Sequence, residues 1–201
     1  MWTVATEYFR LFQHGLHTQY ETPTAQLDFL QAMTVPNISA GTVQSVATIV
    51  RNWVVFTRFF QDIDMQLQSL KKVDDCVLLA STTVTMTLSR HSLVNLFPHL
   101  FYGGVIQEMQ GIENRVYGIA KKLIDQRLVL SGSVRFAWNN STHRVERIDS
   151  EFDMMTPLLR LLDSVEDVSF VFNGGLITPS FNVIRTVCPE LETRSVNMMQ
   201  V

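Results

Sequence analysis

Residues 76–89, CVLLASTTVTMTLS, alternate between two kinds of side chain with a period of two, and this pattern constrains the fold more than any other feature. Alternation of this kind is typical of an antiparallel strand with one buried and one polar face. The expected buried face carries Leu78, Ala80, Thr82, Val84, Met86 and Leu88. The opposite face carries Ser81, Thr83, Thr85 and Thr87.

Three further segments favour extended structure. Residues 62–70 also alternate, and residues 71–75, KKVDD, are expected to form the turn that joins them to 76–89. Residues 126–138 and 143–154 form a second expected strand pair, joined by the turn residues Asn and Ser of NNST. Gly132 lies in the middle of the third strand, where such a sheet is expected to bend.

The remaining segments favour helices, because their apolar residues recur every three or four positions. Pro98 divides an expected insertion at about 90–125, which carries one or two helices, and VPNIS at 35–39 is expected to be a short extended piece. One helix is expected over 154–173, ending before Gly174. The N-terminal helices are expected at 2–16, 24–33 and 42–60.

This order of elements predicts an α+β fold in which a curved antiparallel sheet packs against N-terminal helices. The layout resembles the cone of NTF2-like folds, also called SnoaL-like. Hydrophobic residues make up 46% of the chain and charged residues 17%, which suffices for one sizeable core. We expect a single domain over residues 1–181, with the insertion at about 90–125, followed by a C-terminal tail over 182–201.

Several long segments resemble the region that follows the leucine zipper in oomycete bZIP transcription factors. They are VATEYFRLFQHGL (4–16), QLDFLQAMTVPNI (26–38), LVNLFPHL (93–100) and the run from RLVLSGSVRFAW to EDVSFVF (127–172). The resemblance implies a C-terminal regulatory or interaction domain of a transcription factor, which binds a small apolar ligand or a protein partner and is located in the nucleus and also in the cytoplasm. It implies a homodimer, because a zipper brings two copies together. DNA would be bound only through a basic region and zipper, which this sequence lacks.

The charge and the cysteine content of the chain limit the kinds of binding partner and cellular compartment that are expected. The net charge of −3 argues against a domain that grips a phosphate backbone by itself. The basic residues Arg115, Lys121, Lys122 and Arg127 are interpreted as a solvated helix face rather than a nucleic-acid patch. No apolar run is long enough for a membrane span. The two cysteines, Cys76 and Cys188, indicate a reduced intracellular compartment rather than a disulfide framework.

No catalytic motif for phosphate binding, zinc hydrolysis or serine nucleophiles is present, and we predict no enzyme, no metal and no cofactor. His14 and His17 form an HxxH pair that lacks a third ligand. Charged residues recur at every other position of 147–153, but their strand carries apolar Ile148 and Phe152 on its other face. We therefore expect these charges, Arg147, Asp149, Glu151 and Asp153, to face solvent or a partner.

The interior of the expected cone could hold a small apolar ligand. Seven residues at core spacing are candidates for its lining: Tyr8, Phe12, Trp53, Met86, Phe136, Trp138 and Met154. Simple filling of the core is the default interpretation for all of them, and ligand lining is the hypothesis weighed against it. An enzyme of the isomerase or hydrolase type, with an ionisable group inside the cone, is a second alternative and would require a buried group with a shifted pKa.

Overall fold

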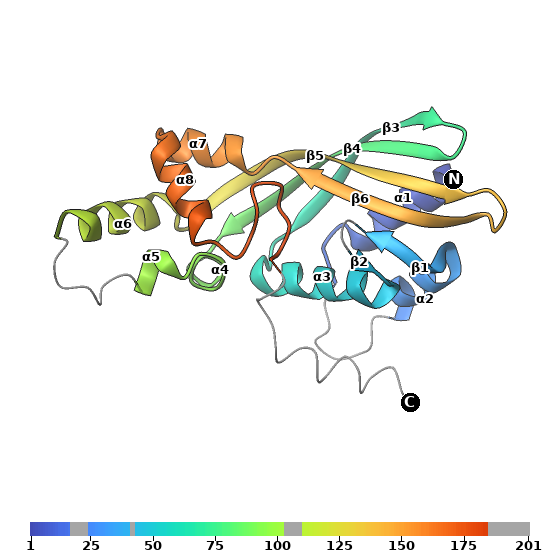
Figure 1. Cartoon of the computed structure of the whole chain (residues 1–201), viewed down its shortest axis with the longest axis horizontal. Helices are drawn as coiled ribbons and strands as arrows, with labels where there is room; N and C mark the ends of the chain where they lie inside the picture. Colours follow the sequence, from blue (N-terminus) through green and yellow to red (C-terminus); the bar gives the residue numbers. More distant parts are fainter. Residues whose placement is uncertain (17–23, 41–42, 103–109, 185–201) are drawn as a thin grey trace.

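The computed structural model describes residues 1–16, 24–40, 43–102 and 110–184, and Figure 1 shows a sheet with helices gathered at both ends. The sheet has six strands in the order β2-β1-β6-β5-β4-β3. Its four long strands are antiparallel neighbours, as the alternation predicts: β3 (Asp64–Asp74), β4 (Val77–Leu88), β5 (Gln126–Asn139) and β6 (Arg144–Phe152). The two short strands are β1 (Thr34–Ala40) and β2 (Val43–Gln44).

The predicted helices are present in the predicted order. The first three are α1 (Trp2–Phe12), α2 (Thr24–Met33) and α3 (Val46–Phe59). The insertion was expected to carry one or two helices, but its described residues hold three: α4 (Arg90–Leu96), α5 (His99–Tyr102) and α6 (Gln110–Leu123). Two further helices, α7 (Met155–Leu162) and α8 (Val165–Asn173), follow the sheet. The α+β layout of a curved sheet against N-terminal helices, with a helical insertion, is therefore confirmed.

The two faces of β4 separate as the alternation predicts. Its six inward residues, from Leu78 to Leu88, are at most 2% exposed, whereas Ser81 on the opposite face is exposed. The predicted turn at 71–75 is wrong in extent. Lys71 to Asp74 continue β3 opposite Leu79 to Val77, which leaves only Asp75 and Cys76 in the turn.

The sheet is mixed rather than purely antiparallel, which corrects the prediction. The segment expected as a short extended piece becomes β1 and pairs parallel with β6, with Ser39 opposite Arg147. The seven residues of β1 include Pro36 and show no clear alternation, so nothing in the local pattern marked them as part of the main sheet.

The predicted bend at Gly132 stays a prediction, but the structure shows a packing role for this residue. Gly132 pairs with Thr82 within the β4–β5 ladder and with Phe152 at the end of the β5–β6 ladder. A Cβ atom at Gly132 would lie 2.3 Å from the Phe152 ring and 2.4 Å from the carbonyl oxygen of Glu151. The glycine therefore makes room for the ring of Phe152 on the inner face of the sheet.

The single helix predicted over 154–173 is divided into α7 and α8. Asp163 adopts a left-handed conformation, with φ 54° and ψ 30°, which ends α7. Ser164 then caps α8, because its hydroxyl accepts a hydrogen bond from the backbone N–H of Asp167 at 3.1 Å. A left-handed residue followed by a serine cap is a break that apolar spacing alone does not reveal.

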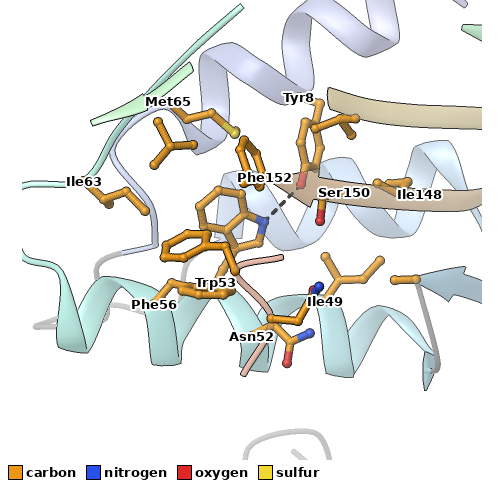
Figure 2. A pocket seen from close by; sticks show the side chains of 15 residues that line it. Tyr8, Ile49, Asn52, Trp53, Phe56, Ile63, Met65, Ile148, Ser150 and Phe152 are labelled. Atoms are coloured by element: carbon orange, nitrogen blue, oxygen red, sulfur yellow. Dashed lines mark hydrogen bonds between the residues drawn. The ribbon is translucent and has the colours of Figure 1, made fainter. Parts of the chain in front are cut away.

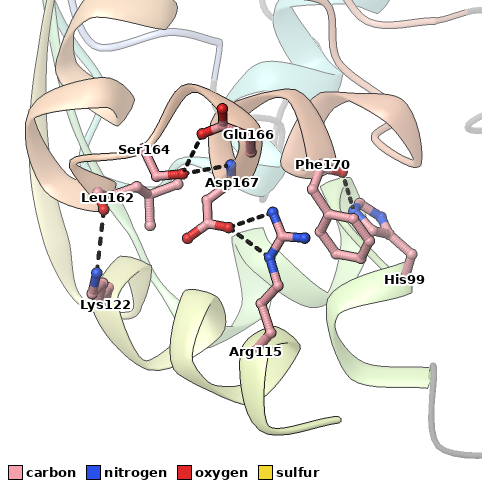
Figure 3. Close-up of polar contacts among 8 residues, drawn as sticks. All are labelled: His99, Arg115, Lys122, Leu162, Ser164, Glu166, Asp167 and Phe170. Carbon is pink, nitrogen blue, oxygen red and sulfur yellow. Dashed lines mark hydrogen bonds and ion pairs between the residues drawn. The ribbon is translucent and has the colours of Figure 1, made fainter. Parts of the chain in front are cut away.

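Polar contacts tie the insertion to the last two helices (Figure 3). Arg115 on α6 forms an ion pair with Asp167 on α8 at 2.6 Å. Lys122 donates to the carbonyl oxygen of Leu162 at the end of α7, at 3.2 Å. The Nε2 atom of His99 lies 3.1 Å from the carbonyl oxygen of Phe170, which accepts the hydrogen bond.

Candidate functional site

A cavity of about 90 Å³ lies between the inner face of the sheet and helices α1 and α3 (Figure 2). Such a volume holds several water molecules or a small organic group. Five side chains of its lining come from α1 and α3: Tyr8, Ile49, Asn52, Trp53 and Phe56. The strands contribute Ala40, Met65, Val84, Val134, Ile148, Ser150 and Phe152, and the rest of the lining is Ile63, Phe181 and Asn182.

Tyr8 and Trp53 form a polar pair at the wall of the cavity. The indole Nε1–H of Trp53 donates to the hydroxyl oxygen of Tyr8 at 3.2 Å, as Figure 2 shows. Burial raises the pKa of Tyr8 to about 12, although the hydrogen bond from Trp53 opposes this shift. The phenol therefore stays protonated at neutral pH, and its O–H remains a hydrogen-bond donor.

The polar groups of the lining are uncharged. Asn52, Ser150 and Asn182 add amide and hydroxyl groups to the phenol and the indole. Within the described part of the chain, the lining contains no Asp, Glu, Lys, Arg or His. Because a buried charge without a partner is costly, this cavity suits an uncharged ligand with one or two hydrogen-bonding groups.

Aromatic rings form a second layer behind the polar pair. The ring of Phe12 stacks on Trp53 with centroids 5.2 Å apart, and Phe136 meets Tyr8 edge-on at 5.4 Å. The side chains of Phe12 and Phe136 are at most 1% exposed. Their contacts fix the orientation of Tyr8 and Trp53, because the two buried phenylalanine rings leave little free space for other rotamers.

The seven predicted lining residues fall into three groups. Tyr8 and Trp53 line the cavity, whereas Phe12 and Phe136 contact them from behind. The other three, Met86, Trp138 and Met154, are buried elsewhere in the core and do not line the cavity. Ligand binding by any of the seven stays a prediction.

Thirteen of the fifteen lining residues were not predicted, and three of them differ in the signal that the sequence offered. Ser150 lies between Ile148 and Phe152 on the inner face of β6, and a lone serine on an apolar face was a signal for a polar point in the cavity. Asn52 had a weaker signal, because it directly precedes Trp53 on α3. Phe181 had none, because it reaches the cavity from a segment outside the helices and strands.

The alternating charges of β6 lie outside the cavity, as predicted. Arg147, Glu151 and Asp153 are exposed, and Asp149 is half-buried. Arg147 donates to Asp149 at 2.6 Å. Hydrogen bonds from the side chain and backbone of Thr156 hold the pKa of Asp153 below its usual range, so this carboxylate caps the start of α7.

The other predicted polar features have structural partners or fall outside the described residues. Arg115 and Lys122, from the predicted basic helix face, bind Asp167 and the end of α7. His14 lies 3.7 Å from Asp64, whereas His17 and Cys188 are outside the described residues. In the described ranges, no three His, Cys, Asp or Glu side chains are grouped to hold a metal ion. Nor does any described helix have the length and apolarity to cross a membrane.

Residues 2–59 match the family model of the BZIP transcription factor 1 C-terminal domain. The match covers 58 of the 201 residues. The predicted resemblance to the C-terminal region of bZIP transcription factors is confirmed over this segment, which spans α1 to α3. The matched segment supplies the cavity wall formed by α1 and α3, including Tyr8 and Trp53.

Solved structures similar to this chain include two bacterial proteins. A SnoaL-like polyketide cyclase from Agrobacterium tumefaciens is 12% identical, with a TM-score of 0.49 over 79% of this chain and 94% of that chain. An NTF2-like protein of unknown function from Burkholderia pseudomallei is 10% identical, with a TM-score of 0.46 over 81% and 97%. Activities are not carried over from these proteins, because one fold hosts unrelated functions. Among curated proteins, none matches this chain.

Proposed function

We propose that this chain is a non-catalytic regulatory domain of a bZIP transcription factor, which binds a small, uncharged, apolar ligand in the cavity beneath its sheet. The observation that carries the proposal is the composition of the lining. It is largely apolar, contains no charged side chain among the described residues, and offers the phenol of Tyr8 as an oriented donor. The family match supports the regulatory setting, because its segment includes the cavity wall formed by α1 and α3. We assign DNA contact to a basic region and zipper outside this chain, and the site of action to the nucleus.

The experiment that tests this proposal is native mass spectrometry of the purified chain. We expect a mass increment of a small organic molecule that is lost under denaturing conditions. The variant Ile148→Glu places a carboxylate in the lining and should not carry the increment. A chain with no increment, which also fails to bind any uncharged aromatic compound at millimolar concentration, would contradict ligand binding and favour a purely structural module.

The proposal includes a homodimer formed by the outer face of the sheet. Exposed side chains of three adjacent strands share this face, and they are mostly small, polar or of mixed charge: Ser81, Val129, Ser131, Arg135, Arg147 and Glu151. A self-complementary contact around a two-fold axis needs both signs of charge on one surface, which this face provides.

Light scattering after size exclusion tests the dimer. Val129 is 57% exposed on β5, the central strand of this face, and Val73 is 59% exposed near the turn between β3 and β4. We expect a dimer for the unmodified chain and for Val73→Glu, and a monomer for Val129→Glu. A monomer at high concentration for the unmodified chain would contradict a sheet-mediated dimer.

One observation favours the second candidate, an enzyme of the isomerase or hydrolase type. Tyr8 is a buried ionisable group at the cavity with a raised pKa, as such an enzyme would require. With a pKa of about 12, however, the phenol is protonated near neutral pH and cannot act as a base. Its role there is to donate a hydrogen bond. A turnover that Tyr8→Phe abolishes would favour the enzyme, whereas weaker ligand binding without turnover favours the regulatory domain.

A further inference from the structure

Residues 176–184 form a small hairpin-like segment that closes one side of the cavity. Ile177 and Val183 form an isolated antiparallel bridge. Within the segment, the backbone N–H of Thr178 donates to the carbonyl oxygen of Asn182 at 2.8 Å. Phe181 stands at the tip with φ +60°, a left-handed conformation that a bulky residue rarely adopts. Strain of this kind persists only where the surroundings hold the residue in place.

The side chain of Phe181 is held in place by contacts with neighbouring aromatic rings. Its side chain is 5% exposed and stacks on Phe56 with ring centroids 4.7 Å apart. Phe60 lies at 5.6 Å, and Phe152 meets it edge-on at 6.0 Å. Phe56 and Phe152 line the cavity together with Phe181, so the ring is seated in the cavity wall.

Few main-chain bonds attach the tip of this segment to the rest of the fold. The backbone N–H of Met154 donates to the carbonyl oxygen of Pro179 at 3.1 Å, and that of Phe152 donates to Ser180 at a long 3.4 Å. At the base of the segment, Leu176 donates to Leu96 at 2.7 Å. The tip therefore depends mainly on the burial of one aromatic ring, and a ring of similar shape could take its place.

The small size of the cavity also supports displacement of the Phe181 ring by a ligand. Its volume of about 90 Å³ is well below the roughly 300 Å³ at which pockets for drug-sized ligands begin. Displacement of the Phe181 ring would enlarge the space against Phe56 without any change in the sheet or in α1. The segment could then swing about its base at Leu176 and Ile184, which are joined by a 2.9 Å backbone hydrogen bond.

We propose that Phe181 is a displaceable plug, and that the ligand is an uncharged molecule with a flat aromatic ring and one hydrogen-bond acceptor. This inference rests on the proposed ligand-binding function. The ligand ring replaces Phe181 against Phe56, and its acceptor faces the phenol O–H of Tyr8. Displacement moves residues 177–183 outward, so that occupancy of the cavity changes the surface of the domain.

Binding of 1-naphthol, an uncharged bicyclic aromatic alcohol, tests the plug. Phe181→Asn removes the ring and keeps a residue that tolerates positive φ. We expect this variant to bind 1-naphthol about tenfold more tightly than the unmodified chain, because an aromatic stack no longer has to be broken. The matched control is Ile184→Asn, in the same segment but 41% exposed and outside the lining, which should keep the affinity of the unmodified chain.

Hydrogen exchange of the unmodified chain gives a second readout that needs no variant to fold. Saturation with 1-naphthol should speed amide exchange over residues 177–183. Equal affinities for the unmodified chain and Phe181→Asn, with no change in exchange, would overturn the plug and leave the cavity as a ligand site. Absence of binding to either chain would overturn both the plug and the proposed function.

Discussion

The indole Nε1–H of Trp53 donates to the hydroxyl oxygen of Tyr8 at 3.2 Å, and this contact joins α3 to α1 at the wall of the cavity. The phenol uses an acceptor site for this bond and keeps its own hydrogen for a ligand. Phe12 and Phe136 hold the two rings from behind. A single side-chain pair thus couples the packing of the N-terminal helices to the polarity of the cavity.

Tyr8→Phe tests the structural part of this coupling. The change removes the acceptor of the Trp53 indole and should lower the free energy of unfolding by about 1 kcal/mol. Urea denaturation measures the loss. Tyr117→Phe is the matched control, because the side chain of Tyr117 is 70% exposed and its change should leave the urea midpoint in place. Equal midpoints for both variants would show that the bond adds no stability.

Gly132→Ala tests the space beneath Phe152. The added methyl group would meet the Phe152 ring at 2.3 Å and the Glu151 carbonyl oxygen at 2.4 Å, so we expect a loss of stability. Overpacking of this kind costs about 1–3 kcal/mol. Gly118→Ala on α6 is the opposite case, since a Cβ there meets nothing within 4 Å. The helix propensity of alanine should make that variant more stable by up to about 1 kcal/mol. Thermal unfolding measures both changes. If the melting temperatures of the two variants shifted in the same direction, the described packing at Gly132 would be refuted.

The break between α7 and α8 gives a third pair of variants. Asp163 has φ 54°, so Asp163→Gly should stabilise the chain, because glycine adopts this conformation without strain. Ser164→Ala removes the cap of α8 and should cost about 1 kcal/mol. Chemical denaturation measures both variants. A larger unfolding free energy for Ser164→Ala than for Asp163→Gly would argue against this description of the break between α7 and α8.

His99 predicts a pH dependence of stability. Burial lowers the pKa of His99 and outweighs the hydrogen bond to the backbone carbonyl of Phe170, which raises it. Below the ordinary histidine pKa of about 6.5, His99 is therefore protonated in the unfolded chain but still neutral in the native chain. Stability from this group is fully present above that pH and declines as the pH falls toward the lowered native pKa. Between pH 7 and 5, the unfolding free energy of His99→Gln should fall less steeply than that of the unmodified chain. Parallel curves would exclude a role for His99.

The parts of the fold set by local periodicity could be predicted from the sequence. The alternation from Leu78 to Leu88 placed the buried face of β4 correctly, and the spacing of apolar residues over 42–60 predicted the helix α3. The parallel pairing of β1 with β6 could not be predicted, because a seven-residue segment with Pro36 carries no signal for its distant partner. The break at Asp163 depends on one backbone conformation that apolar spacing does not record.

The candidate site was predictable only in part, for a related reason. Periodicity indicates which face of a strand is buried, but not where along the sheet an unfilled space lies. Met86 and Trp138 share the inner face with the strand residues of the lining, yet they pack in the solid core away from the cavity. Phe181 reaches the cavity through the packing of a distant segment on Phe56, and no local pattern encodes that contact.

The most direct test of the ligand-binding cavity is an NMR titration of the three tryptophan indole N–H signals with 1-naphthol. Only Trp53 lines the cavity, whereas Trp2 is 50% exposed on α1 and Trp138 is buried in the core, so the chain supplies its own controls. We predict a saturable shift of the Trp53 signal, with the Trp2 and Trp138 signals nearly unchanged. A Trp53 signal that does not move up to millimolar 1-naphthol, or that moves no more than the exposed Trp2 signal, would contradict the account.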